Sequence, residues 1–144
     1  MVTLAVIVII AAMGFPGLQD IAANNKLMTN TNNLIASFNQ ARSEALKRAT
    51  TVQITAKNSD WADGWDVIVN GASIAETAAL PSAIELKQFG SIPFATSYTY
   101  SAQGRLIISN NNQLHVCDSR TGESGRLITL SPMGRVSVER ETCD

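Results

Sequence analysis

The side chains that could carry chemistry in this 144-residue chain are two cysteines and one histidine, all in its last third. Cys117 and Cys143 have no partners at metal-ligand spacing, and His115 alone leaves a zinc site short of ligands. A Cys–His nucleophile pair is disfavoured, because Cys117 lies mid-strand with its neighbour facing the other way and no acid that would orient the histidine is evident. We therefore expect no enzyme activity, no metal site and no cofactor.

A disulfide is the favoured interpretation of the two cysteines. Cys117 lies within an expected strand and Cys143 lies beside the terminus, in a chain whose head indicates export. A bond between them would secure the last hairpin against fraying. The closed loop of about 25 residues corresponds to roughly 3 kcal/mol in the chain-entropy model.

A short unit recurs near the C-terminus: GRLIIS from residue 104, GRLITL from 125 and GRVSVE from 134. In the structural interpretation, glycine makes a turn and arginine starts a strand with its head in water. In the alternative, Arg126, Arg135 and Arg140 contact DNA phosphates. Residues 101–144 hold five arginines and five acids, and the whole chain has a net charge of −1. This balance favours the structural interpretation.

The elements that position these residues begin with an apolar head, MVTLAVIVIIAAMGFPGL. It has no charge, and it is apolar on every side. This pattern favours a membrane-inserted helix that also packs among other helices, over a cleaved signal or a one-sided core helix. The residues assigned to this membrane and filament-core helix are Val2, Leu4, Ala5, Val6, Ile7, Val8, Ile9, Phe15, Pro16 and Leu18.

From Asn24 to Ala49 the helical pattern continues but becomes one-sided. Apolar residues recur at alternating spacings of four and three, which marks one helix face. We predict a nearly continuous helix over residues 1 to about 48, disturbed only near Pro16, with two helices broken there as the alternative. Residues 1–23 form its hydrophobic half, and residues 24–144 form a globular domain. The packing stripe consists of Leu27, Leu34, Phe38, Ala41 and Ala45.

The remainder of the chain is typical of β-structure. Short alternating runs are separated by clusters of Ser, Asn, Gly and Pro, which predicts an α+β domain with antiparallel sheets. The helix stripe is expected to lie on one sheet face. Residues 70–97 are expected to be mostly loop with one strand inside. Strands are predicted within 50–57, 65–70, 83–89, 97–103, 104–109, 113–117, 125–131 and 134–140.

Taken together, these features resemble the minor type IV pilins, in the class that includes FimU, FimT and GspH. The motifs that carry the resemblance are the apolar head, ARSEALKRATTVQI, a W…GW turn and GRLITLSPMGRV followed by a cysteine. The resemblance implies that the head is inserted in the inner membrane and later packs in a filament core. Pro16 matches the proline that bends this helix in pilins.

Pilin precursors begin with a short basic leader, a glycine, and then a phenylalanine and a nearby glutamate. This sequence starts at Met1, several residues inside the expected helix. The roles of those residues in leader cleavage, methylation and subunit contact are therefore not carried over.

Three functions remain open within this class. The arrangement of the two cysteines around GRLITLSPMGR is most similar to FimU-like members, which implies a subunit of the priming complex near the pilus tip, serving twitching motility, adhesion and DNA uptake. A FimT-like member would bind DNA during natural transformation, and a GspH-like member would be a type II secretion pseudopilin. The implied partners are other minor pilins, the major pilin and the inner membrane, and no small-molecule substrate. The implied location is the inner membrane with a periplasmic domain, and then the pilus at the cell surface.

Overall fold

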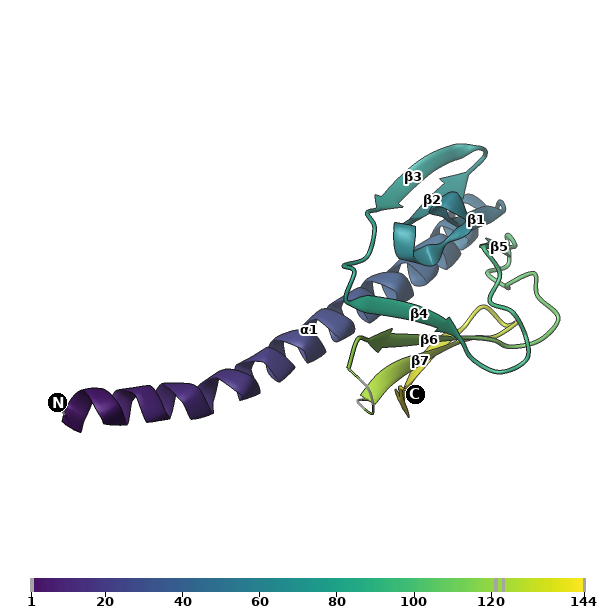
Figure 1. Ribbon diagram of the computed structural model, residues 1–144. Coiled ribbons are helices and arrows are strands. Elements are labelled where there is room, and N and C mark those ends of the chain that lie inside the picture. The colour runs from purple at the N-terminus through teal and green to yellow at the C-terminus, as the bar shows by residue number, and fades with distance from the viewer. Residues whose placement is uncertain (1, 121, 123, 144) are drawn as a thin grey trace.

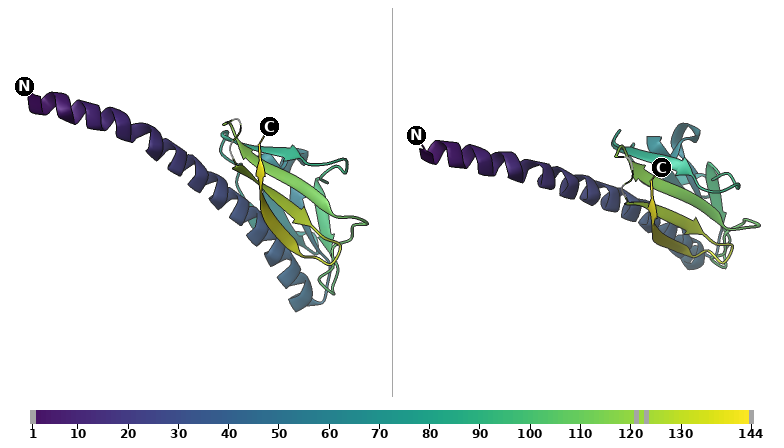
Figure 2. Two further views of the ribbon diagram at one scale, coloured as in Figure 1. Left: turned by 90° about the horizontal axis from the view of Figure 1, so that it is seen from below. Right: turned by 60° about the horizontal axis from the view of Figure 1, so that its bottom comes forward.

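A long N-terminal helix packs against a β-rich domain. The computed structural model describes residues 2–120, 122 and 124–143, with side chains from residue 19 onward except Ser124. Helix α1 (Val2–Arg48) is 47 residues long and is unbroken, as predicted. The disturbance expected at Pro16 does not interrupt it, and the helix curves gently along its length (Figure 2). Among the described residues, no helix combines the length and the apolarity needed to cross a membrane.

Within the described residues, eight strands form two four-stranded sheets, both antiparallel throughout, which confirms the predicted α+β fold. The first sheet has the order β3-β2-β1-β5 and the second has the order β4-β6-β7-β8. In the first sheet the strands are β1 (Val52–Ala56), β2 (Trp65–Val69), β3 (Ala72–Thr77) and β5 (Ser97–Tyr100). In the second they are β4 (Ile84–Gln88), β6 (Asn112–Asp118), β7 (Ser124–Leu130) and β8 (Val136–Thr142). Two short 3-10 turns, η1 (Lys57–Ser59) and η2 (Trp61–Asp63), separate β1 from β2.

The core lies between α1 and the two sheets. The alternating residues of β1 and β2 that face the helix are buried, and so are Tyr98 and Tyr100 on β5. The helix packs against strands of both sheets, not against one face of one sheet as the sequence indicated. The first sheet covers the C-terminal end of α1 and the second lies nearer its middle (Figure 1).

The W…GW turn closes one side of this core. Asp60 caps η2, because its side chain accepts a hydrogen bond from the Ala62 N–H. This cap directs Trp61 inward, where its ring stacks on Phe38 with 5.7 Å between centroids and its indole N–H donates to the Ala95 carbonyl. Helix, turn and first sheet therefore share one aromatic cluster.

Two strand predictions were wrong. Strand β3 lies in the region expected to be mostly loop, where no apolar alternation marks it because it is a largely exposed edge strand that pairs with β2 alone. The run after Gly104 is not a strand, since Leu106 makes only an isolated bridge to Tyr100. Its backbone N–H donates to the Pro132 carbonyl instead of to a ladder.

Candidate functional site

The packing stripe of α1 attaches the helix to the domain. All five predicted stripe residues are buried, none more than 1% exposed. The first of them is Leu27, and Thr31 is buried on the same face. N-terminal to about residue 19 the helix projects beyond the sheets as an arm (Figure 1). The ten residues assigned to the membrane and filament core lie on this arm, outside the residues whose side chains are described.

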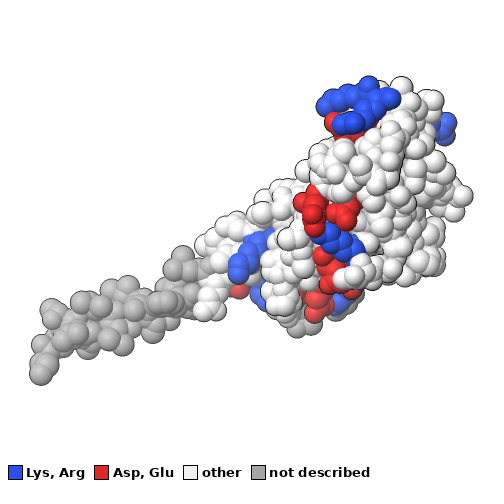
Figure 3. All heavy atoms as spheres, turned by 90° about the horizontal axis from the view of Figure 1, so that it is seen from above, with Lys and Arg blue, Asp and Glu red and all other residues white. Residues whose placement is uncertain are grey.

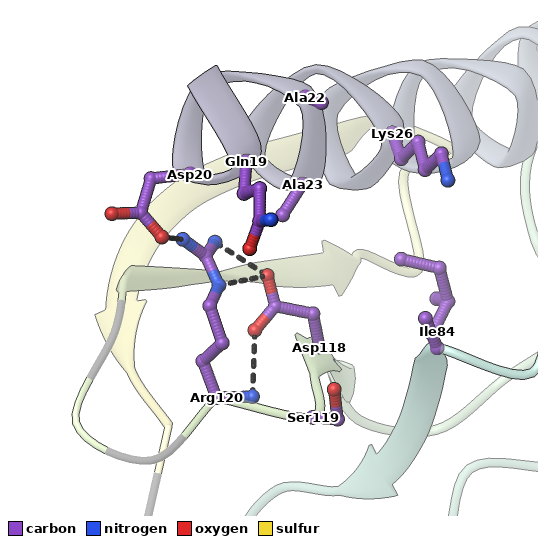
Figure 4. A pocket seen from close by; sticks show the side chains of 10 residues that line it. Gln19, Asp20, Ala22, Ala23, Lys26, Ile84, Asp118, Ser119 and Arg120 are labelled. Atoms are coloured by element: carbon purple, nitrogen blue, oxygen red, sulfur yellow. Dashed lines mark hydrogen bonds and ion pairs between the residues drawn. The ribbon is translucent and has the colours of Figure 1, made fainter. Parts of the chain in front are cut away.

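An arginine near the end of the second sheet fixes the point where the arm leaves the domain (Figure 4). The Arg120 guanidinium donates to Asn24 Oδ1 at 2.8 Å and to Asp20 Oδ1 at 3.1 Å, both on α1. It also donates to Asp118 Oδ2 at 2.6 Å, at the end of β6. We call Asp20, Asn24, Asp118 and Arg120 the arginine clamp.

Within the arginine clamp, Asp118 is the buried member. Its carboxylate accepts hydrogen bonds from the side chain and from the backbone N–H of Arg120. The side-chain hydrogen bond from Arg120 is the main cause that holds the pKa of Asp118 below its usual range, against the opposing effect of burial. Asp20, by contrast, has a side chain that is 64% exposed, so its ion pair is screened by water. The buried pair of Asp118 and Arg120 orders the loop that follows β6. The exposed pair of Arg120 and Asp20 joins that loop to α1.

Beside the arginine clamp lies a groove between α1 and the start of β4. Its volume is about 380 Å3. Small side chains on the helix, Ala22 and Ala23, form one wall, and Ile84 forms part of the other (Figure 4). The two carboxylates at its rim, Asp20 and Asp118, are both paired with Arg120, and Lys26 and Ser119 are among the other polar residues that line it.

The two cysteines are bonded to each other across the outer face of the second sheet. The disulfide joins Cys117 on β6 to Cys143, just beyond β8, with 5.9 Å between the Cα atoms. His115 lies on the same face, with its Nε2 3.8 Å from Cys143 Sγ. Both cysteines are thus occupied by the bond, and the end of the chain is held against the sheet.

The absence of a side chain at Gly125 makes room for the disulfide and for His115, a cluster that we call the disulfide corner. A Cβ on Gly125 would collide with Cys143 Sγ and would lie 2.8 Å from both His115 Nε2 and the Val116 carbonyl oxygen. The glycine of the second GR unit therefore serves close packing against the disulfide, and not a turn as the sequence indicated.

The three arginines proposed as DNA contacts do not form one group. Arg126 and Arg140 are directly opposed across β7 and β8, beside Glu139, in a groove that α1 closes. Arg126 is partly buried and donates to the Gly125 carbonyl. Arg135 lies before β8 at the other end of the strand, in the turn that follows β7. The structure therefore brings two of the three together and separates the third.

The arginine clamp was not found from the sequence. Asp118 and Arg120 stand close together in the chain, which is a weak turn signal. The contact with Asp20 spans 100 residues, and no local pattern reports such a contact.

The family model described as "Type II transport protein GspH" matches residues 30–134. No curated protein matches the chain. Two crystal structures of the type IV minor pilin FimU of Pseudomonas aeruginosa (strain PAO1) are similar to it, both at 22% identity. In space group P21 the match has a TM-score of 0.69 and covers 84% of this chain and 97% of that chain. In space group P65 the TM-score is 0.62, with 81% and 99% covered.

Proposed function

Because this chain belongs to the GspH family and has the fold of a minor pilin, we propose that it is a structural subunit of the complex that primes type IV pilus assembly and remains near the pilus tip. Its partners are other minor pilins and the major pilin. Its location is the inner membrane with a periplasmic domain, and later the cell surface.

One observation carries this proposal. The buried contacts between the domain and α1 begin at Leu27, and the polar contacts of Arg120 reach back to Asp20. The uncharged first 18 residues therefore belong to an arm that projects beyond the domain (Figure 1). An arm that is apolar all round needs lipid or other helices around it. In this proposal it lies first in the membrane and then among the arms of neighbouring subunits, where close helix packing replaces the lipid contacts. Residues 1–23 then act as the assembly half of the helix and residues 24–144 as the periplasmic domain.

The test is deletion of the gene in its host, followed by counts of surface pili in electron micrographs. We expect few or no pili, and restoration by the wild-type chain. A chain with Val8→Asp should fail to restore them, since a charge in the arm opposes burial in lipid or among helices. Ile74→Ser, on the exposed edge strand β3, is the matched control and should restore them. Normal pili in the deletion strain would contradict the proposal.

A second candidate function is favoured by the description of the family model, which names a type II transport protein. In that case the chain is a minor pseudopilin of a secretion system. The same deletion strain separates the two functions. Loss of secreted enzymes from the medium with normal pili supports the pseudopilin, whereas loss of pili with normal secretion supports the priming subunit.

A further inference from the structure

The end of the domain farthest from the helix N-terminus has an unusual mixture of charge and apolar surface. Three segments meet there, 46–51, 101–107 and 131–135, and we call them the distal end. Every charged residue in these segments is basic: Lys47, Arg48, Arg105 and Arg135. In a chain with a net charge of −1, this end therefore carries four positive charges. Blue side chains gather at the end of the molecule opposite the arm (Figure 3).

The three segments of the distal end are in direct contact. A Cβ on Gly104 would lie 3.1 Å from Leu46 Cδ2, and a Cβ on Gly134 would collide with the Gly104 carbonyl oxygen. The Leu106 N–H also donates to the Pro132 carbonyl at 3.2 Å. The fold therefore brings together segments that lie far apart in the sequence. The turns at 101–105 and 131–135 are in van der Waals contact.

These two turns have the same internal structure. In each, the glycine N–H donates to the serine carbonyl at 2.8 Å, as seen for Gly104 to Ser101 and Gly134 to Ser131. Each turn ends in an arginine, Arg105 or Arg135, whose backbone closes the turn while its side chain is exposed. Neither guanidinium has a hydrogen bond or ion pair with the described residues. Two hydrogen-bonded turns thus present two positive charges that nothing described within the domain neutralises.

The cations at the end of α1 are only partly neutralised. Glu44 pairs with both Lys47 and Arg48, at 3.5 Å and 2.7 Å, so one carboxylate is shared by two cations. Cations in the last helical turn also interact favourably with the helix dipole, which gives Lys47 and Arg48 a structural role. That role does not extend to Arg105 and Arg135, which lie outside the helix.

Apolar side chains are exposed among these charges. Ile107 and Met133 are 65% and 60% exposed, the highest values among the large apolar residues described, and Leu46 is 52% exposed. Nucleic-acid surfaces that bind single strands use aromatic rings for stacking, and the distal end has aliphatic chains instead. A mixture of apolar side chains and arginine with a charged rim is typical of protein interfaces. An anionic membrane is the less suitable partner, because the distal end lies opposite the arm.

We propose that the distal end is a docking surface for a protein partner that presents carboxylates around a small apolar patch. This inference rests on the proposed function, in which a subunit with its arm toward the membrane offers its distal end to the next subunit outward. Arg105 and Arg135 attract and orient the partner's carboxylates, and Met133 and Ile107 pack against its apolar patch.

The test uses the purified full chain and labelled probes of equal charge in fluorescence anisotropy. The probes are a 12-residue peptide of glutamate and leucine, a matched peptide of glutamate and serine, and a short DNA duplex. We expect the glutamate–leucine peptide to bind most tightly. Arg105→Gln/Arg135→Gln should weaken its binding about tenfold, and Met133→Ser/Ile107→Ser should remove the preference for leucine over serine.

The matched control is Lys26→Gln/Arg140→Gln, which removes the same charge away from the distal end and should leave peptide binding unchanged. An equal loss in the control would show that only net charge matters and would overturn the proposal. Tighter binding of the duplex, or of vesicles containing anionic lipid, would also overturn it. The peptide assay does not depend on pili. If the peptide binds as expected but the deletion strain has normal pili, the proposed function is contradicted and the docking surface is still supported.

Discussion

At the residue scale, the disulfide corner depends on the absence of a side chain at position 125. Gly125→Ala places a methyl group against Cys143 Sγ and His115, and we expect it to lower the free energy of unfolding by about 1–3 kcal/mol. Urea unfolding measures this change. Gly71→Ala, where a Cβ meets nothing within 4 Å, is the control and should show only the strain of its positive φ, about 1 kcal/mol.

A second background sharpens the same experiment. In a Cys117→Ala/Cys143→Ala chain the sulfur that meets the new methyl group is gone. Gly125→Ala should therefore have a smaller effect there than in the oxidised wild type. An equal effect in both backgrounds would mean that the contact with Cys143 is not the cause.

The arginine clamp also makes a prediction at this scale. Asp118→Asn removes the buried carboxylate that orders Arg120, and we expect a loss of about 1–3 kcal/mol at pH 7. Because the pKa of Asp118 is lowered on folding, its stabilising contribution is present above the unfolded value near 3.8 and disappears as the pH falls through the lower, folded value. Wild type and variant should therefore converge in acid.

Unfolding curves at pH 7 and at pH 3 measure this convergence. Asp20→Asn is the matched control, since it removes the exposed partner of the same arginine and should change stability by less than about 1 kcal/mol. A constant difference between wild type and Asp118→Asn at both pH values would contradict the assignment.

At the element scale, α1 divides at the start of its buried stripe. Deletion of residues 1–22 removes the arm and the exposed Asp20 contact but keeps every stripe residue, so we expect a folded domain with cooperative thermal unfolding. Circular dichroism during heating measures this. Deletion of residues 1–30 also removes Leu27, a side chain 1% exposed, and should lower stability by a further 2–5 kcal/mol, roughly. Absence of cooperative unfolding in the shorter deletion would contradict the division.

How much the sequence predicted also depends on the element. The stripe residues were predictable because one buried face leaves a period in the chain, and the alternating strands β1 and β2 were predictable for the same reason. Strand β3 lacks that period, and only the Asn70-Gly71 turn, with positive φ at both residues, signals the hairpin that leads into it. The prediction of a strand after Gly104 is wrong because Leu106 is buried by contact with the turn at 131–135, not by pairing in a sheet.

At the scale of the whole molecule, the net charge of −1 does not show that the positive charges are unevenly distributed over the domain. Non-specific DNA affinity depends on how many phosphates are neutralised together. Arg126 and Arg140 lie beside Glu139, while Arg135 lies at the distal end, so the three arginines do not form a continuous basic surface. We therefore expect a dissociation constant for duplex DNA of roughly 10⁻⁴ M or weaker near physiological salt.

A titration of the full chain with duplex DNA at two salt concentrations measures this affinity, beside Arg126→Gln/Arg135→Gln. Low-micromolar binding with a steep salt dependence, lost in the double variant, would support a DNA-uptake pilin in place of the priming subunit. No measurable binding in either protein agrees with the priming role.

The disulfide has a mechanical consequence. In the proposed filament, load reaches the subunit through its helix. The chain beyond Cys117 can lengthen under that load only as far as its cross-link permits. The bond joins residues 26 positions apart, so at about 3.5 Å per extended residue roughly 90 Å of contour length is withheld. When the chain is stretched between its two ends in optical tweezers, the oxidised form should extend about 90 Å less on complete unfolding than the reduced form. Equal extensions in the two redox states would mean that the cross-link is absent under load.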